Sequence, residues 1–91
     1  MNICELQWDD SNIEHIARHG TSPKEVEDVC FGSHISGKEG KARYILGGRT
    51  ENGRYLTVVI ERVGKGIFRP ITAFEMSERD KASYRRRSKD R

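Results

Sequence analysis

The chain has 91 residues, of which 34% are hydrophobic and 34% are charged, so the sequence predicts one small globular domain with a polar surface. No apolar run approaches the roughly 18 residues that a membrane-spanning helix needs. The acidic N-terminal segment MNICELQWDD has no signal-peptide core, and the two cysteines, Cys4 and Cys30, lack the spacing of metal ligands. We therefore expect a cytoplasmic protein with reduced thiols and with no metal or other cofactor.

Charge is distributed unevenly along the chain. Residues 1–45 hold 5 Lys or Arg against 8 Asp or Glu, a net charge of −3, whereas residues 46–91 hold 12 against 6, a net charge of +6. Nine of those twelve basic residues are arginine, whose planar guanidinium can bind a phosphate with two hydrogen bonds. The basic half is expected to bind a polyanion, either a nucleic acid or an acidic protein.

The acidic half predicts one strand and two short helices. Residues 3–8 alternate in polarity and form a strand candidate, and the polar run 9–11 offers N-caps for a helix that continues to about His19. Gly20 is expected to end that helix in the left-handed conformation. Ser22-Pro23-Lys24-Glu25 begins the second helix, with Ser22 as N-cap and Glu25 as its capping-box partner.

The basic half predicts a three-strand meander and a last helix. The polar segment 33–41 is expected to be a mobile loop. Strands follow at 43–49, 54–63 and 67–73, separated by an Asn-Gly turn and a glycine turn, with an edge or a bulge near Pro70. Ser77 is expected to be the N-cap of the last helix.

The predicted fold is therefore α+β in the order β-α-α-β-β-β-α. An antiparallel sheet, made of the meander and the N-terminal strand, packs with the two early helices and the C-terminal helix. Residues 1–87 form the domain, and residues 88–91 form a basic tail.

Short segments spread along the chain resemble, in their order and spacing, the BrnT family of bacterial toxins. The match runs from about residue 6 to residue 86. The segments are Gln7-Trp8-Asp9, Arg18-His19-Gly20, Ser22-Pro23-Lys24-Glu25-Val26, Leu46-Gly47-Gly48-Arg49-Thr50, Gly53-Arg54-Tyr55-Leu56, Arg69-Pro70-Ile71-Thr72-Ala73, Met76-Ser77 and Tyr84.

The resemblance implies a fold similar to that of the RelE ribonucleases and an activity, metal-independent RNA cleavage that halts translation. It also implies a partner, a BrnA-like antitoxin with a ribbon-helix-helix domain that dimerises, binds operator DNA and neutralises the toxin. The expected complex holds two chains of each kind in the bacterial cytoplasm. The chain departs from the family at two places, because many relatives have a lysine where Asn12 and Glu14 lie and an arginine where Phe74 stands.

Metal-free RNA cleavage uses the ribose 2′-hydroxyl as nucleophile and needs a base, an acid and cations around the phosphate. The sequence offers arginines on the predicted strands, and two of them on neighbouring strands could clamp one phosphate. The candidate catalytic residues are Arg49, Arg69, Glu78, Tyr84 and His19, and the candidate substrate-binding residues are Arg43 and Arg54.

Each candidate also has a structural interpretation. The strand arginines could pair with Glu51 or Glu61, Glu78 could complement the helix dipole, and His19 could be a C-cap. Tyr84 could pack against the sheet. His15 and His19 have the i, i+4 spacing of metal ligands but no third ligand in a matching motif, so we expect no metal site.

Three functions remain open from the sequence. The first is an RNA-cleaving toxin. The second, motivated by Phe74, is a toxin-like module that has lost catalysis and acts in a repressor complex with its antitoxin. The third is a basic nucleic-acid-binding domain, for which the sequence has no helix-turn-helix, ribbon or zinc motif.

Overall fold

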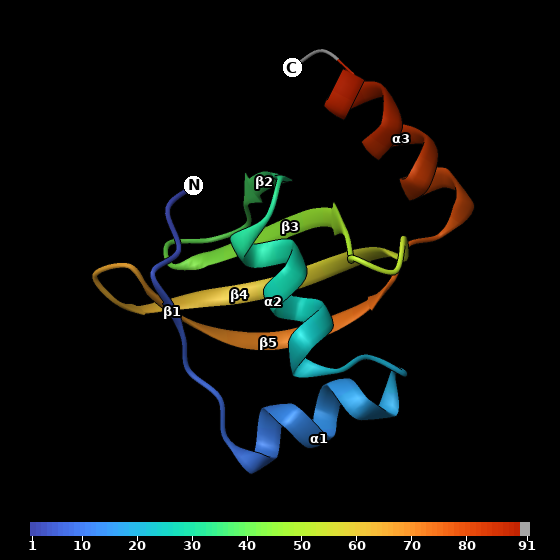
Figure 1. Cartoon of the computed structure of the whole chain (residues 1–91). Helices are drawn as coiled ribbons and strands as arrows, with labels where there is room; N and C mark the ends of the chain where they lie inside the picture. The colour runs from blue at the N-terminus through green and yellow to red at the C-terminus, as the bar shows by residue number, and fades with distance from the viewer. Residues whose placement is uncertain (90–91) are drawn as a thin grey trace.

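A computed structural model describes residues 1–89 of the chain and shows an α+β fold, as expected from the sequence (Figure 1). The elements, in chain order, are β1 (Glu5–Leu6), α1 (Asp10–Arg18), α2 (Pro23–Phe31), β2 (His34–Lys38), β3 (Arg43–Arg49), β4 (Tyr55–Gly64), β5 (Ile67–Glu75) and α3 (Glu78–Lys89). Residues 88 and 89 of the predicted basic tail are the last residues of α3, and residues 90 and 91 lie outside the described part.

The five strands form one sheet in the order β1-β5-β4-β3-β2, so β4 is central and β3, β4 and β5 form the predicted antiparallel meander. The prediction of a purely antiparallel sheet is wrong, because β1 pairs in parallel with β5, with Leu6 opposite Phe68. Both of these side chains are buried in the core. A parallel pair needs a long connection, and here everything from α1 to β4 lies between the two strands.

The segment 33–41 is not the mobile loop that its polarity predicted. Residues 34–38 form β2, which pairs antiparallel with β3 along its whole length, from His34 opposite Gly48 to Lys38 opposite Tyr44. The strand escaped prediction because it lies at the edge of the sheet with its side chains exposed or half-buried, so its sequence carries no alternating apolar pattern.

The caps predicted for the end of α1 and the start of α2 are present. Ser22 and Glu25 form the capping box of α2, and Gly20 follows α1 with a φ of 71°. The N-cap of α1 is Asp9, whose side chain accepts a hydrogen bond from the backbone of Asn12 at 3.0 Å. The buried amide of Asn12 donates to the carbonyl of Pro70 at 3.1 Å and so ties α1 to the edge of β5. The pairing register shifts beside Pro70, which confirms the predicted irregularity.

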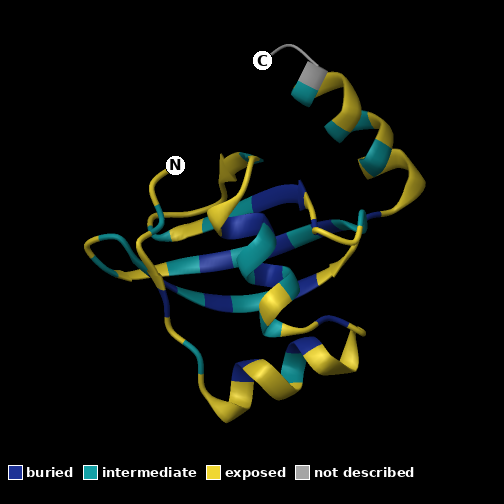
Figure 2. Cartoon of the chain, viewed as in Figure 1, coloured by how far each residue is buried: buried dark blue, intermediate teal, exposed yellow. Residues whose placement is uncertain are grey.

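The two early helices cover one face of the sheet, which we call the inner face (Figure 2). The core consists of Leu6, Ile16, Val26, Val29, Cys30, Leu46, Leu56, Val58, Ile60, Phe68 and Ala73. Gly48 of β3 lets α2 approach closely, since a β-carbon there would lie 3.1 Å from Val29 Cγ1 and 3.2 Å from the carbonyl oxygen of Ser33. Gly48 therefore marks a close approach of α2 to the sheet.

The C-terminal helix α3 lies away from this core. Ser77 Oγ accepts a hydrogen bond from the backbone of Asp80 at 3.1 Å, as expected of an N-cap. Figure 2 shows exposed and half-buried residues along α3, and residues 78–88 include none that is fully buried. The helix therefore leaves the other face of the sheet, the outer face, largely open. Within residues 1–89, no helix is long and apolar enough to cross a membrane.

Candidate functional site

A group of cations gathers around one tyrosine on the outer face, where β3 turns into β4. Arg49 ends β3, and Tyr55, its cross-strand partner, begins β4. The guanidinium carbon of Arg49 lies 4.8 Å from the centre of the Tyr55 ring. From α3, Lys81 Nζ lies 5.8 Å and the guanidinium carbon of Arg85 lies 5.2 Å from the same ring centre.

A second tyrosine completes the group. The rings of Tyr55 and Tyr84 lie 5.8 Å apart, nearly perpendicular at 77°, which is a favourable edge-to-face contact. Residues 81, 84 and 85 share one face of α3 because they are three and four positions apart. We call the five residues Arg49, Tyr55, Lys81, Tyr84 and Arg85 the cationic corner.

The cationic corner changes the acidity of its central phenol. A hydrogen bond from Arg85 and the charges of Arg49, Arg85 and Lys81 lower the pKa of Tyr55 below its ordinary value, although desolvation acts in the opposite direction. Lys81 Nζ also lies 3.0 Å from a carboxylate oxygen of Glu78, whose side chain is 88% exposed. The ion pairs found within residues 1–89 include none for Arg49 or Arg85, so the corner holds more positive than negative charge.

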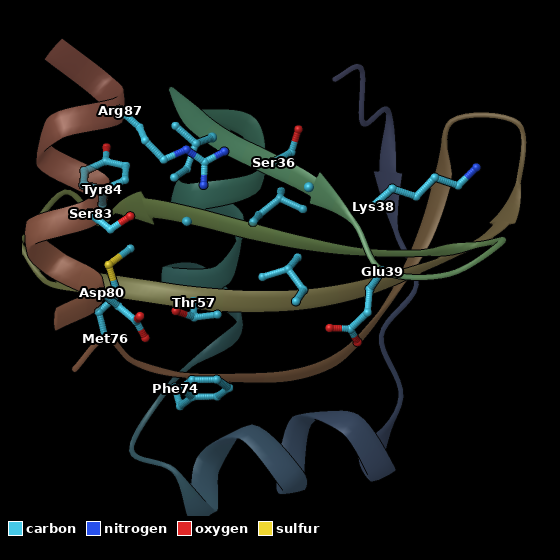
Figure 3. A pocket seen from close by; sticks show the side chains of 15 residues that line it. Ser36, Lys38, Glu39, Thr57, Phe74, Met76, Asp80, Ser83, Tyr84 and Arg87 are labelled. Carbon is cyan, nitrogen blue, oxygen red and sulfur yellow. The ribbon is translucent and has the colours of Figure 1, made fainter. Parts of the chain in front are cut away.

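A groove of about 510 Å³ adjoins the corner, between the outer face and α3 (Figure 3). Tyr84 belongs to both the groove and the corner. The groove is lined by Ile35, Ser36, Gly37, Lys38, Glu39, Ile45, Leu46, Gly47, Thr57, Phe74, Met76, Asp80, Ser83, Tyr84 and Arg87. A second hollow of about 600 Å³ lies between the end of α2 and the β3–β4 turn, and Arg49 and Tyr84 line it as well. The corner is therefore open to ligands on both sides.

The structure brings three of the predicted catalytic residues together and leaves the others apart. Arg49 and Tyr84 are in the corner, and Glu78 adjoins it through Lys81. Arg69 lies toward the opposite end of the sheet, because its partner on β4 is Glu61, six residues beyond Tyr55. Six residues of extended strand span about 20 Å, and β4 separates β3 from β5. Arg49 and Arg69 are therefore too far apart to clamp one phosphate.

The arginines at that opposite end are engaged in ion pairs. Both terminal nitrogens of Arg69 donate to Asp9, the N-cap of α1, and this contact lowers the pKa of Asp9 and raises that of Arg69. Arg43 Nη2 lies 3.3 Å from a carboxylate oxygen of Glu61. Arg43 thus pairs with one of the two expected carboxylates, whereas Arg69 pairs with Asp9 and not with Glu51 or Glu61. A role of either arginine in RNA binding stays a prediction.

Arg54 ties three elements together. Its Nη1 donates to Glu25 at 2.6 Å and to the carbonyl of Gly20 at 2.9 Å, and its Nε donates to Glu75 at 3.4 Å. Glu25 is itself the capping-box residue of α2. This arrangement links β4 to the turn between α1 and α2, and it accounts for Arg54 without a ligand.

His19 is the C-cap of α1, where it is exposed, and its ring lies 5.2 Å from that of His15. His15 Nε2 in turn lies 3.1 Å from Thr72 Oγ1. Within residues 1–89 no group of three His, Cys, Asp or Glu side chains is placed to hold a metal ion.

Sequence reasoning did not single out Tyr55, Lys81 and Arg85. The spacing of Lys81, Tyr84 and Arg85 on one helical face was visible in the sequence, and it could have marked this side of α3 as a basic and aromatic stripe. The pairing of that stripe with Arg49 and Tyr55 depends on where α3 packs, which local patterns do not show.

Comparison of the chain with protein-family models, with curated proteins and with solved structures gave no match.

Proposed function

We propose that the chain is the toxin of a bacterial toxin-antitoxin pair and that it cleaves RNA without a metal ion at the cationic corner. The observation that carries the proposal is the convergence of Arg49, Lys81 and Arg85 on the ring of Tyr55, which contacts the ring of Tyr84, at an open surface. The resemblance of the sequence to the BrnT family supports the same activity.

In the proposed reaction, the ribose 2′-oxygen attacks the neighbouring phosphorus and loses its proton. The bond from phosphorus to the 5′-oxygen breaks, the 5′-oxygen takes up a proton, and a 2′,3′-cyclic phosphate remains. The three cations stabilise the negative charge that builds up on the phosphorane oxygens. In this proposal the hydroxyl groups of Tyr84 and Tyr55, whose rings are in contact, transfer protons, and Glu78, which pairs with Lys81, is the carboxylate that accepts one.

The proposal assigns Arg69, Arg43 and Arg54 to structure, since each already makes ion pairs. It includes a BrnA-like ribbon-helix-helix antitoxin as partner, two chains of each in the complex, operator DNA bound through the antitoxin, and a cytoplasmic location. We expect an acidic surface of the antitoxin to bind the basic surface of this chain.

The proposal is tested by incubating purified protein with RNA in EDTA and by expressing it in bacteria. We expect RNA fragments with cyclic phosphate ends, and growth arrest that a co-expressed cognate antitoxin relieves. Intact RNA after incubation with folded protein would contradict the proposal, with folding checked by circular dichroism.

A second candidate function is a toxin-like module with weakened catalysis that acts in a repressor complex. Phe74 favours it, because an apolar ring lines the groove where the resemblance would place a cation. The Phe74→Arg variant discriminates between the two. A large gain in RNA cleavage over a nearly inert parent supports the module, whereas an active parent removes it.

A further inference from the structure

The groove beside the cationic corner has an apolar part that phosphate binding does not use. Its floor follows one row of cross-strand neighbours, from Phe74 on β5 through Thr57 and Gly47 to Ile35 on β2. These residues point to the outer face together because directly opposed residues share a face. The row spans three strand spacings, or about 14 Å between its ends.

The two residues in the middle of this row, Thr57 and Gly47, are small, and the two at its ends, Phe74 and Ile35, are large. Met76 lies over Gly47, since its Cε would be 3.1 Å from a β-carbon at that position, and Ile35 Cγ1 would be 3.4 Å away. Thr57 is therefore the low point of the floor, with Phe74 on one side and Met76 on the other (Figure 3). Asp80 and Ser83 of α3 form the wall above it.

Phe74 and Val63 are the two large apolar residues of the sheet that are exposed, at 38% and 46%, and Phe74 is the aromatic one. Ala73 and Phe68, on the same strand as Phe74, are buried. A planar aromatic ring that faces an open groove is a surface on which another planar ring can stack. The neighbouring cations of the corner favour a ligand that also carries negative charge.

We propose that this groove binds one unpaired nucleobase of a single-stranded nucleic acid, stacked on Phe74, while the adjoining phosphate rests on the cationic corner. The inference rests on the proposed function in taking RNA as the natural ligand. Tyr84 lines the groove and is part of the corner, so a base and its own phosphate can occupy the two at once. A volume of about 510 Å³ suits a ligand of nucleotide size.

The geometry also excludes one form of nucleic acid. Bases in a duplex are stacked on their neighbours and cannot turn a face toward Phe74, so the groove selects unpaired nucleotides. Phosphate contacts alone would bind duplex and single strand alike, because they recognise charge. The apolar floor therefore adds a selectivity that the corner lacks.

The test uses short 2′-deoxy oligonucleotides, which lack the attacking hydroxyl and cannot be cleaved by the proposed reaction. One single strand carries all its bases, a second has the same length with abasic sites, and the third probe is a duplex. Fluorescence anisotropy gives the affinity of each for the wild type, for Phe74→Ala and for Ile13→Ala. Ile13 is the matched control, because its apolar side chain is 38% exposed, as Phe74 is, but lies on α1 and lines neither the groove nor the second hollow.

We expect the base-bearing strand to bind about tenfold more tightly than the abasic strand, which carries the same charge. Phe74→Ala should abolish this difference and Ile13→Ala should keep it. Phe74→Trp should retain base-dependent binding, and the added tryptophan emission should be quenched by the base-bearing strand. Circular dichroism of each variant checks that the fold is retained.

Equal affinity of the base-bearing and abasic strands for the wild type would overturn the base site, while RNA cleavage at the corner could still be observed. Base-dependent binding without RNA cleavage would instead overturn the nuclease and keep the base site. A Phe74→Ala variant that loses antitoxin binding but keeps base-dependent oligonucleotide binding would show that the groove holds a protein segment, and would also overturn the inference.

Discussion

Replacing Arg54 by alanine should destabilise the fold more than removing any other single arginine–carboxylate contact in residues 1–89. Arg54 is 31% exposed and Glu25 is 15% exposed, so the pair is partly shielded from water. The same guanidinium also donates to the carbonyl of Gly20 and to Glu75. Its removal leaves the capping-box carboxylate of α2 without its cation and frees the turn between the two early helices.

The size of the effect follows from this intermediate burial. Exposed pairs contribute at most about 1 kcal/mol, and breaking a fully buried pair costs about 3–5 kcal/mol. We therefore expect Arg54→Ala to lower the free energy of unfolding by about 2 kcal/mol. For a domain of this size, that corresponds to a decrease in Tm of about 10 °C.

The effect should depend on pH through Glu25. Desolvation raises the pKa of Glu25, but hydrogen bonds from Arg54 and Ser22 outweigh it, so the pKa lies below the ordinary value of 4.5. A carboxyl whose pKa is lowered by folding stabilises the native state above its unfolded pKa, and this contribution is lost as the pH falls through the folded pKa. The difference between wild type and variant should thus be largest near neutral pH and shrink below about pH 4.5.

Urea unfolding followed by circular dichroism measures this difference, with Arg43→Ala as control. Arg43 pairs with Glu61, but the side chains are 44% and 40% exposed, so its removal should cost about 0.5 kcal/mol or less. In a Glu25→Gln background, Arg54→Ala should cost less than in the wild type. If Arg54→Ala and Arg43→Ala lowered the free energy of unfolding by equal, small amounts, the reasoning would be refuted.

Three further predictions concern other parts of the fold. Arg69→Ala should lower the urea midpoint only slightly, because Asp9 keeps its capping hydrogen bond to Asn12. A decrease as large as that of Arg54→Ala would show that the Arg69–Asp9 contact stabilises more than the cap of α1. Gly48→Ala should lower the free energy of unfolding by about 1–3 kcal/mol, because the added methyl group overlaps α2, and an unchanged midpoint would contradict this packing. Absorbance titration should show the phenol of Tyr55 ionising below its ordinary pKa of 10.0, and Arg85→Gln should raise that pKa; an unchanged value would place Arg85 away from the ring.

Local patterns in the sequence predicted the helix ends and the meander because these features depend on neighbouring residues. Ser22 and Glu25 cap α2 through contacts three positions apart, and Gly20 adopts the left-handed conformation that few other residues tolerate. The apolar alternation of residues 54–63 likewise predicted a strand, which is β4, the centre of the sheet. Its buried residues Leu56, Val58 and Ile60 face the two helices.

The features that the sequence did not predict depend on contacts far apart in the chain. The edge strand β2 is held by backbone hydrogen bonds to β3, which do not require apolar side chains. The parallel pairing of β1 joins Leu6 to Phe68, and no local pattern sets the direction of such a pair.

The candidate site also combines residues that the sequence predicted with an arrangement that depends on distant contacts. Arg49 and Tyr84 could be selected from the sequence, but the distance between Arg49 and Arg69 could not, because it depends on strand order and register. The sequence predicted Tyr55 only as a residue of the strand 54–63. Its position among three cations became evident only from the packing of α3 against the β3–β4 turn.

Metal-free RNA cleavage by Arg49→Ala and Arg69→Ala tests the location of the active centre most directly. Both variants are assayed in EDTA beside the wild type, at a temperature where urea unfolding shows each to be folded. We expect Arg49→Ala to lower the cleavage rate by about 100-fold, because it removes a cation that stabilises the phosphorane, and Arg69→Ala to keep a rate close to that of the wild type. A rate that falls with Arg69→Ala and persists with Arg49→Ala would place the chemistry at the other end of the sheet and contradict the account.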